Sequence, residues 1–481
     1  MSVLLWIPLL LPLATAAAAW WRRDHAWTRP SDLVVAAVVL GTGLAMIAAV
    51  AAHGPLVAGG GLLRADALSA WLLTTIGAVA LTALWGGLPE RSAPQGPPDG
   101  RYTALICLFL AAMSLAVLAD NLGVLWVAIE ATTIATAFLV GHHRTQRSLE
   151  AAWKYVVLGS VGVAIAFLGI VLLYAATVAA GEPTLSWAAL ADGGIPLDPD
   201  LTRIAVALAV LGFATKAGLA PMHSWLPDAH SQAPAPVSGL MSGVLLSVAL
   251  YAILRIQAIS TSVIGPGFLR GLLVAGGLLS LAVAAALILA QRDYKRMLAY
   301  SSIEHMGIMA LGAAAGGPLA TAAVLLHMLG HGLVKAVMFV VAGRILAAEG
   351  SSRTDDVRAL LARRPDLARP LLAGTAALLG FPPFVLFFTE AAIVIACWQR
   401  GLGWAMTAAL VLLLIVFAGL GRHVAAMSLG EPTENTGFPP RAVGRRVPLA
   451  LALGLAAVLG FAAVPLAGPL GDAAAALAGT R

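Results

Sequence analysis

Apolar stretches of about 20 residues recur along almost the whole chain, and this feature most limits the folds open to it. Each stretch is long enough to cross about 30 Å of hydrocarbon as a helix, which satisfies its own backbone hydrogen bonds there. Cutting the chain at its polar and Pro- or Gly-rich breaks predicts about 14 such helices. We therefore expect an all-α polytopic membrane protein, with residues 1–481 forming a single membrane domain. The expected helix starts lie near residues 3, 33, 66, 102, 121, 152, 203, 237, 269, 297, 318, 371, 405 and 447.

The composition excludes several classes of protein. Charged residues make up 11% of the chain and hydrophobic residues 60%, whereas soluble domains carry about 25% charged residues. The net charge of +6 does not indicate nucleic-acid binding, because Lys and Arg gather in the cytoplasmic loops of membrane proteins. Cys107 and Cys397 lie in separate apolar stretches without a partner at metal-ligand spacing, so we expect no disulfide, haem, iron–sulfur cluster or other cofactor.

The distribution of basic residues predicts the orientation in the membrane. Loops after odd-numbered spans hold 21 of the 29 Lys and Arg residues, and loops after even-numbered spans hold 5. The odd loops are therefore expected in the cytoplasm of a bacterial cell and both termini on the periplasmic side of its inner membrane. No Lys or Arg precedes Arg22, so we interpret the first apolar run as a spanning helix and not as a signal peptide.

Two of the expected helices contain prolines that should interrupt them. Pro221 and Pro227 follow Lys216 in the seventh span, and Pro382 and Pro383 precede Glu390 in the twelfth. Proline breaks a helix, which membrane proteins tolerate where the freed backbone lines a cavity or packs against protein. Paired interruptions five spans apart predict two related five-helix units and a transport path between them.

Ionisable residues inside the apolar stretches are the candidates for function. A charge at a helix centre costs about 2.5–3.5 kcal/mol, so it requires a partner, water or a role in transport. Glu130 lies about 14 Å from the outer end of the fifth span, and Lys216 lies about 20 Å into the seventh. We expect the two to form a buried pair that carries protons, although a purely structural ion pair is the alternative.

A second set of ionisable residues lies in LLHMLGHGLVKAVMF. His327, His331 and Lys335 recur at every fourth position, which places them on one helical face over about 12 Å. Histidine titrates near neutral pH, so this ladder suits proton transfer. A zinc site is the alternative, but no acidic residue accompanies the histidines as in HExxH, so we expect no metal. Glu390, towards the outer surface, is the candidate exit, and capping of the broken helix is its alternative.

Further residues are weaker candidates for the same path. Glu304 and His305 lie near a basic cytoplasmic loop, where interfacial hydrogen bonding competes with a relay. His223, Asp228 and His230 flank the break in the seventh span, and they suit either a cytoplasmic entry or helix capping.

Several long motifs, in order, resemble a known family. They are NLGVLWVAIEATTIATAFLVG, LEAAWKY, GFATKAGLAPMHSWLPDAHSQAPAPVSGLMSGVLL, RDYKRMLAYSSIEHMGIM and HMLGHGLVKAVMF. Together they resemble the antiporter-like subunits of respiratory complex I and its relatives, over roughly residues 100–395. VAIEATT and SWLPDAHSQAPAPVSGLMSGVLL indicate the hydrogenase-4 component F group, found with membrane-bound nickel–iron hydrogenases and formate hydrogenlyase-type complexes.

The resemblance implies a fold of 14 helices with two inverted five-helix repeats, here 102–258 and 269–428, around a hydrated polar axis. It makes Glu130 and Lys216 the family's fifth-helix glutamate and seventh-helix lysine, and Glu390 the twelfth-helix Lys or Glu. His327, His331 and Lys335 match the polar face of the eleventh helix. Ser247 stands where complex I subunits usually carry an eighth-helix lysine, so water or a neighbouring histidine must bridge the centre.

Our hypothesis is a subunit that conducts protons from cytoplasm to periplasm, driven by redox chemistry elsewhere in a complex. The resemblance implies other membrane subunits and a peripheral, hydrogenase-like redox module as partners, besides the lipid bilayer. One alternative keeps the fold, as a subunit of a cation/proton antiporter or of a proton-driven inorganic-carbon uptake system. The other is a non-conducting membrane anchor, which would gain nothing from costly interior charges.

Overall fold

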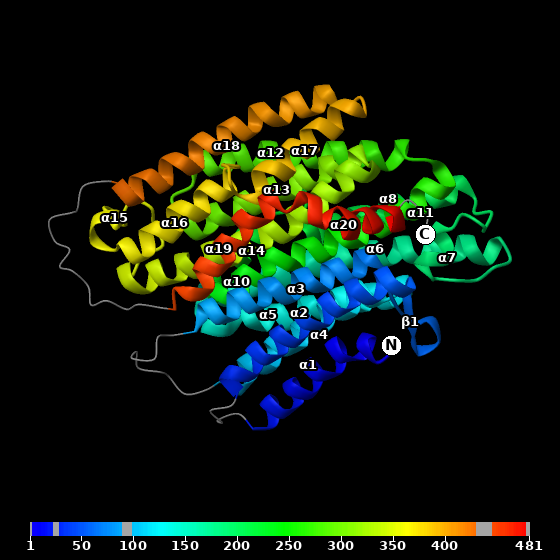
Figure 1. The fold of residues 1–481 in the computed structure, drawn as a ribbon, viewed down its shortest axis with the longest axis horizontal. Helices are drawn as coiled ribbons and strands as arrows, with labels where there is room; N and C mark the ends of the chain where they lie inside the picture. Colours follow the sequence, from blue (N-terminus) through cyan, green and yellow to red (C-terminus); the bar gives the residue numbers. More distant parts are fainter. Residues whose placement is uncertain (1, 23–27, 89–98, 430–444, 478–481) are drawn as a thin grey trace.

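A computed structural model of the chain describes residues 2–22, 28–88, 99–429 and 445–477, and they are almost entirely helical (Figure 1). Of the basic residues used to predict orientation, Arg23, Arg91, Arg441 and Arg481 lie outside the described residues. The helices are α1 Val3–Trp21, α2 Thr28–His53, α3 Ala67–Gly87, α4 Gly100–Leu118, α5 Leu122–Val140, α6 Gln146–Ala179, α7 Trp187–Ala191, α8 Pro199–Ala217, α9 Trp225–Gln232, α10 Ala235–Leu240, α11 Leu246–Ile264, α12 Gly267–Ala290, α13 Tyr294–Ala315, α14 Gly317–Glu349, α15 Leu360–Arg363, α16 Pro365–Leu378, α17 Val385–Gln399, α18 Gly403–Leu429, α19 Val447–Phe461 and α20 Ala463–Leu477.

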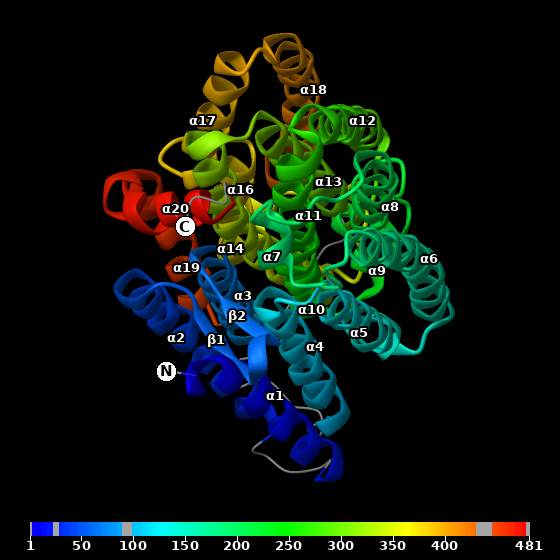
Figure 2. The same ribbon diagram turned by 90° about the vertical axis from the view of Figure 1, so that its right-hand side faces the viewer.

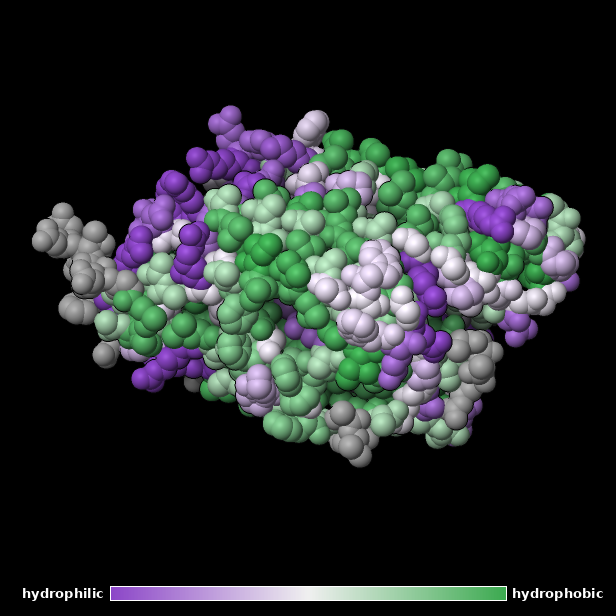
Figure 3. All heavy atoms as spheres, turned by 90° about the horizontal axis from the view of Figure 1, so that it is seen from above, coloured by the Kyte–Doolittle hydropathy of each residue, from purple (hydrophilic) through white to green (hydrophobic). Residues whose placement is uncertain are grey.

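Ten of the described helices are long and apolar enough to cross a membrane, or eleven when the bent pair Val447–Phe461 and Leu466–Leu477 is counted as one span. The expected helix starts lie within six residues of the starts of helices in the structure, and the largest differences are at α6 and α16. The outer helices present apolar side chains such as Trp153, Phe167 and Leu414 to the surface. Figure 3 shows a broad hydrophobic area across the middle of one face, with hydrophilic patches mainly towards its two ends. The chain is a nearly all-helical, multi-pass membrane protein.

Two spans are surrounded by protein along their apolar parts. One is α14, and the other runs through α10, the π-helical turn η3 (Met241–Leu245) and α11. α14 contacts α3, α10, α13, α16, α17, α19 and α20, and Figure 2 shows it in the middle of the bundle. Because α14 carries His327, His331 and Lys335, the candidate ladder lies in the core of the molecule.

Both proline-containing segments interrupt a helix. α8 ends at Ala217, one residue after Lys216, and α9 begins at Trp225. Gly218 closes α8 with φ 74°, in the left-handed region that glycine enters without steric cost. α16 ends at Leu378 and α17 begins at Val385, with Gly380 at φ 65° between them. Pro227 does not contribute to the first break, because it lies in the first turn of α9.

A small hairpin and a short helix occur in connections between the expected spans. β1 (Leu56–Ala58) pairs antiparallel with β2 (Leu63–Ala65) across η1 (Gly59–Gly61). The next residue, Asp66, caps α3 by accepting from Ser69 N at 2.9 Å. Asp66 also accepts from Arg255 of α11 at 2.7 Å, and both side chains are buried. Arg255 stacks 3.6 Å from the ring centroid of Trp187 in α7, so one buried ion pair joins the hairpin, α3, α7 and α11.

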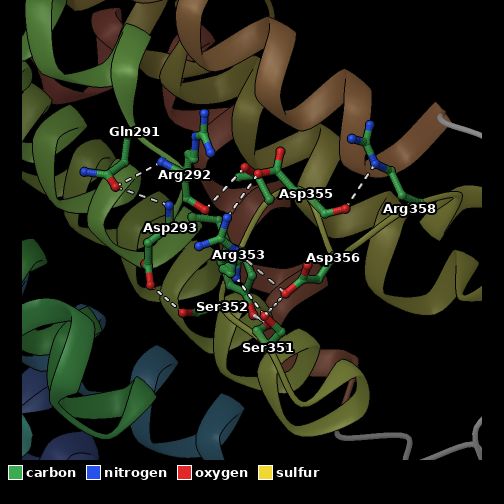
Figure 4. Close-up of polar contacts among 11 residues, drawn as sticks. Gln291, Arg292, Asp293, Ser351, Ser352, Arg353, Asp355, Asp356 and Arg358 are labelled. Carbon is green, nitrogen blue, oxygen red and sulfur yellow. Dashed lines mark hydrogen bonds and ion pairs between the residues drawn. The ribbon is translucent and has the colours of Figure 1, made fainter.

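A polar network joins the connections that flank α13 and α14 (Figure 4). Asp293 caps α13 by accepting from Arg296 N at 2.9 Å, and Ser352 donates to its other carboxylate oxygen. The backbone adds bonds between the two segments, from Tyr294 N to Ser352 O at 3.0 Å and from Thr354 N to Arg292 O at 2.8 Å. The network fixes the start of α13, the helix that carries Glu304 and His305.

Candidate functional site

Most of the main candidate side chains fall in two groups, whose members are buried except for the partly exposed Glu130 and Glu390. The first, which we call the Lys216 cluster, comprises Glu130, Thr133, Tyr155 and Lys216 from α5, α6 and α8. The second, the histidine cluster, comprises His305, His327, His331 and Glu390 from α13, α14 and α17. His230 and Lys335 lie outside these groups and are treated separately below.

Small residues allow α8 to approach α6 closely and so position Lys216. A Cβ on Gly212 would lie 2.4 Å from the backbone nitrogen of Ala166, and a Cβ on Gly169 would lie 2.5 Å from the carbonyl oxygen of Ala205. Contacts this short are possible only without a side chain, as in many membrane helix pairs. Close packing brings the end of α8 within hydrogen-bonding reach of Tyr155 on α6.

Lys216 bonds to hydroxyl groups and not directly to the carboxylate. Its ammonium group donates to Thr133 Oγ1 at 2.8 Å and to Tyr155 OH at 2.6 Å, and the residue is fully buried. Thr133 in turn donates to Glu130 Oε2 at 3.2 Å, and Ser160 donates to Glu130 Oε1 at 2.6 Å. Among the described residues no Glu130–Lys216 ion pair within 4.0 Å occurs. The threonine hydroxyl therefore links the two charges that we expected to touch.

Lys335, on the central helix α14, has similar surroundings. Its ammonium group donates to the carbonyl oxygen of Leu298 at 2.8 Å and to the hydroxyl of Ser301, both on α13. Within the described part of the chain it makes no ion pair with the nearby carboxyl group of Glu304. Both buried lysines are thus held by neutral oxygen atoms.

The histidine cluster gathers three rings from two helices. His327 and His331 stack at 6.3 Å between ring centroids with 17° between ring planes, as expected for neighbours on one face of α14. His305 of α13 lies against both, with its Nδ1 3.1 Å from His327 Nε2 and its ring 4.9 Å from that of His331. All three rings are fully buried. Among the described residues, neither ring nitrogen of His331 nor the Nε2 of His305 has a hydrogen-bond partner.

Glu390 completes this cluster from α17. Its Oε1 lies 3.8 Å from His305 Nδ1. Its Oε2 occupies the space that a side chain on Gly380 would need, 2.7 Å from the position of that Cβ, so the break in the helix makes room for the carboxylate. Glu390 also lines a surface pocket of about 200 Å³ between α13, α17 and α18. Nine residues of α17 follow Glu390, about 14 Å of helix, which is similar to the length of α14 that precedes His327.

His230 lies between the two clusters. It is fully buried, and neither ring nitrogen makes a hydrogen bond of ordinary geometry to the described residues. Its ring lies 6.1 Å from that of Trp225, which packs on Tyr155, and 5.5 Å from that of Phe339 on α14. By contrast, the Ser247 hydroxyl donates to the Gly243 carbonyl oxygen of its own helix, within the π-helical turn, at 3.2 Å.

Asp228 and Glu304 have different surroundings. Asp228 forms ion pairs with Arg296 at 3.0 Å and with Lys154 at 3.4 Å, and it joins α6, α9 and α13 near the surface. Glu304 is buried, with its carboxylate 3.9 Å from His305 Nε2.

Thr133 and Tyr155 could not be singled out from the sequence, because Thr and Tyr are common in helices. Only the packing of three helices shows their contact with an ammonium group.

A family model described as NADH:quinone oxidoreductase/Mrp antiporter, transmembrane, matches residues 119–416, more than half of the chain. The chain belongs to the NADH:quinone oxidoreductase/Mrp antiporter family. All six main candidates, Glu130, Lys216, His327, His331, Lys335 and Glu390, lie inside the matched region of this antiporter-family chain.

Individual members of the antiporter family agree with this assignment. The chain is 39% identical over 346 residues to a hydrogenase-4 component F homolog of Methylacidiphilum infernorum, covering 71% of this chain and 72% of that one. It is 33% identical over 351 residues to NADH-quinone oxidoreductase subunit N of Desulforudis audaxviator, covering 72% and 68%. A chain of the membrane-bound sulfane sulfur reductase, an archaeal respiratory membrane complex, superposes with a TM-score of 0.89 at 25% identity, covering 99% of this chain and 98% of that one. The hydrogenase-4 and complex I resemblance is thereby confirmed.

Proposed function

We propose that this chain carries protons along its line of buried polar side chains, as an antiporter-like membrane subunit of a redox-driven, proton-translocating complex. Its relatives are hydrogenase-4 and NADH-quinone oxidoreductase subunits. Other membrane subunits and a peripheral redox module are accordingly its partners. Electrons move in those partners, and this chain moves protons.

The observation that carries the proposal is the environment of the two buried lysines. Within the described residues, neither Lys216 nor Lys335 contacts a carboxylate, and both bond to hydroxyl or carbonyl oxygens. A purely structural lysine in an apolar interior would be stabilised by a directly paired acid. An ammonium group held by neutral oxygens is free to give up its proton when the charge nearby changes.

In the proposed route, a proton loads Lys216, and Glu130 modulates the loading through the hydroxyl of Thr133. The proton then passes His230, which lies beside Trp225 and Phe339, and which would bridge the centre of the path, where Ser247 provides no charge. It continues through Lys335 and the histidine cluster and leaves by Glu390. Water molecules connect groups that are too far apart for direct hydrogen bonds.

The experiment is proton pumping by inverted membrane vesicles that contain the assembled complex. Lys216→Ala and Glu130→Gln should each reduce the protons pumped per electron pair while redox activity and assembly persist. Arg203→Ala, which removes an exposed basic residue that pairs with Asp200, is the control. Unchanged pumping in both cluster variants would show that the charges are structural and that protons cross elsewhere.

The detailed architecture is also part of the proposal. We propose 14 spans in one membrane domain, residues 1–481, with inverted repeats at 102–258 and 269–428. The two helix breaks support this arrangement, because each stands beside a candidate proton carrier, Lys216 or Glu390. The excess of basic residues in alternate loops supports a bacterial inner-membrane location with both termini periplasmic. Reporter fusions at each loop would test the orientation.

Two alternatives give different results in the same vesicles. A cation/proton antiporter subunit, or a partner in proton-driven inorganic-carbon uptake, would exchange or transport without electron flow. A non-conducting anchor would lose pumping only in variants that fail to assemble. Adding Na⁺ gradients and monitoring assembly separates both from the redox-driven subunit.

A further inference from the structure

The histidine cluster has a second chemical capability, which follows from the positions of three particular atoms. His305 Nδ1 and His327 Nε2 are 3.1 Å apart, and His305 Nδ1 and Glu390 Oε1 are 3.8 Å apart. One ligand atom from each of the three residues falls within 4.8 Å of the others. Zinc holds imidazole nitrogen at about 2.0–2.1 Å in a tetrahedron, which separates neighbouring ligand atoms by about 3.3 Å. The separations of 3.1 Å and 3.8 Å lie on either side of this ligand-to-ligand distance.

We propose that His305, His327 and Glu390 form a binding site for a divalent transition-metal ion, with Zn²⁺ as the best match. Two imidazoles and one carboxylate are a ligand set that zinc takes in proteins, with the fourth position left to water. The HExxH comparison is not decisive, because the acidic ligand comes from α17 and not from the histidine helix.

The groups beside the ring nitrogens that would not bind the metal, which we call the outer partners of the two histidines, suit metal binding. Thr389 Oγ1 lies 2.9 Å from His327 Nδ1 and within 3.0 and 3.1 Å of two backbone carbonyl oxygens of α17. When the Thr389 hydroxyl donates to one of these carbonyls, it accepts from His327 Nδ1, and the lone pair of His327 Nε2 then faces the site. When His305 binds the metal through Nδ1, its proton moves to Nε2, which lies 3.9 Å from the Glu304 carboxylate. Histidine ligands in metal sites are usually oriented by such a hydroxyl, carbonyl or carboxylate partner.

Part of the site reaches the surface of the molecule. The Glu390 side chain is 21% exposed and lines the pocket of about 200 Å³, whereas the two histidines are fully buried behind it. The pocket leaves space beside Glu390 for the water that would fill the fourth position, and its other lining residues are apolar. Because the three ligands are also members of the proposed proton route, bound Zn²⁺ would stop proton passage; this consequence rests on the proposed function.

Metal binding is measured first, on the purified full-length chain in detergent with a tag that contains no histidine. His142 and His143, which are adjacent to each other near the surface, are changed to Gln in every sample to remove a competing metal site. Zn²⁺ binding is followed by competition with a chelating dye, and X-ray absorption reports the ligands. We expect one ion per chain, with two imidazole nitrogens at about 2.0 Å.

Three substitutions test the assignment of ligands. His327→Gln and Glu390→Gln should weaken Zn²⁺ binding by more than the roughly 10- to 100-fold that loss of an outer partner costs. Thr389→Val, which removes only the outer partner of His327, should weaken binding within that roughly 10- to 100-fold range. His230→Gln is the matched control, because it removes another buried, unpartnered histidine and should leave the affinity unchanged. Size-exclusion chromatography confirms that each variant is folded.

Affinity that is unchanged in His327→Gln and Glu390→Gln, or bound zinc without imidazole ligands, would overturn the proposed site. Pumping by vesicles is then measured with and without Zn²⁺. If Zn²⁺ inhibits proton pumping by the wild type but not by Thr389→Val at the same zinc concentration, the result supports both the metal site and the proton route. Binding by the three ligands with undisturbed pumping would leave the metal site standing and would refute the passage of protons through these histidines.

Discussion

The hydroxyl of Thr133 is the most specific feature of the Lys216 cluster, and Thr133→Val removes it with almost no change in volume. Thr133 accepts from Lys216 at 2.8 Å and donates to Glu130 at 3.2 Å. In the variant, Lys216 retains Tyr155 and Glu130 retains Ser160, so each charge keeps one hydrogen bond. Only the link between the two charges is lost.

The size of the effect follows from the strength of that link. A hydrogen bond to a charged group contributes about 1.5–3 kcal/mol. Because each 1.36 kcal/mol corresponds to about a tenfold change in rate, loss of the link should slow proton loading by about 10- to 150-fold. Loading would then limit pumping, and the protons moved per electron pair would fall while electron transfer continued in the partner subunits.

The assay is again proton pumping by inverted vesicles, with assembly checked by native gel electrophoresis. Thr132→Val is a matched control, because Thr132 is the neighbouring buried threonine and its hydroxyl donates only to the backbone of its own helix, to Ile129 O at 2.6 Å. If Thr133→Val pumps as well as Thr132→Val, the hydroxyl is not part of the proton path and the reasoning about this cluster is refuted.

Three further predictions concern stability, measured as unfolding temperature in detergent. Arg255→Leu leaves the Asp66 carboxylate buried and unpaired, which should cost about 3–5 kcal/mol. Burial alone would raise the pKa of Asp66, but the ion pair and its hydrogen bonds hold that pKa below the ordinary 3.8. The ion pair therefore stabilises the fold above about pH 4, and this stabilisation is lost as the pH falls through the lower pKa of Asp66 in the folded state. The difference in unfolding temperature between wild type and Arg255→Leu should consequently shrink in acid. A difference that stays constant with pH would contradict this prediction. Gly212→Ala forces α6 and α8 apart and should lower the stability by about 1–3 kcal/mol. Gly41→Ala is the control, because the space around its added Cβ is open and the stability should not fall. Equal falls in unfolding temperature for the two variants would contradict the close approach of α6 and α8. Asp293→Ala removes the cap of α13 and should cost about 1 kcal/mol, and an unchanged unfolding temperature would show that the cap does not contribute.

Much of the site could be anticipated because the cost of burying charge is independent of the fold. Glu130, Lys216 and Lys335 were recognisable in the sequence because a charge inside an apolar stretch requires an explanation wherever the helix packs. The spacing of His327 and His331 likewise determined that they share a face, since that depends only on the helical repeat. His305 was a weaker candidate, because nothing in its own helix shows that it lies 3.1 Å from His327.

The sequence by itself determined the membrane environment, the helix starts, the two helix breaks and the identity of the buried ionisable residues. These follow from local physics: hydrocarbon thickness, backbone hydrogen bonding and the geometry of proline. Only the tertiary structure decided which groups touch. Thr133 lies between Glu130 and Lys216, and Glu390 lies beside His305, because helices distant in the sequence pack side by side. Such contacts depend on the rotation and depth of each helix against its neighbours, which are set by the packing of many side chains at once and not by any one segment.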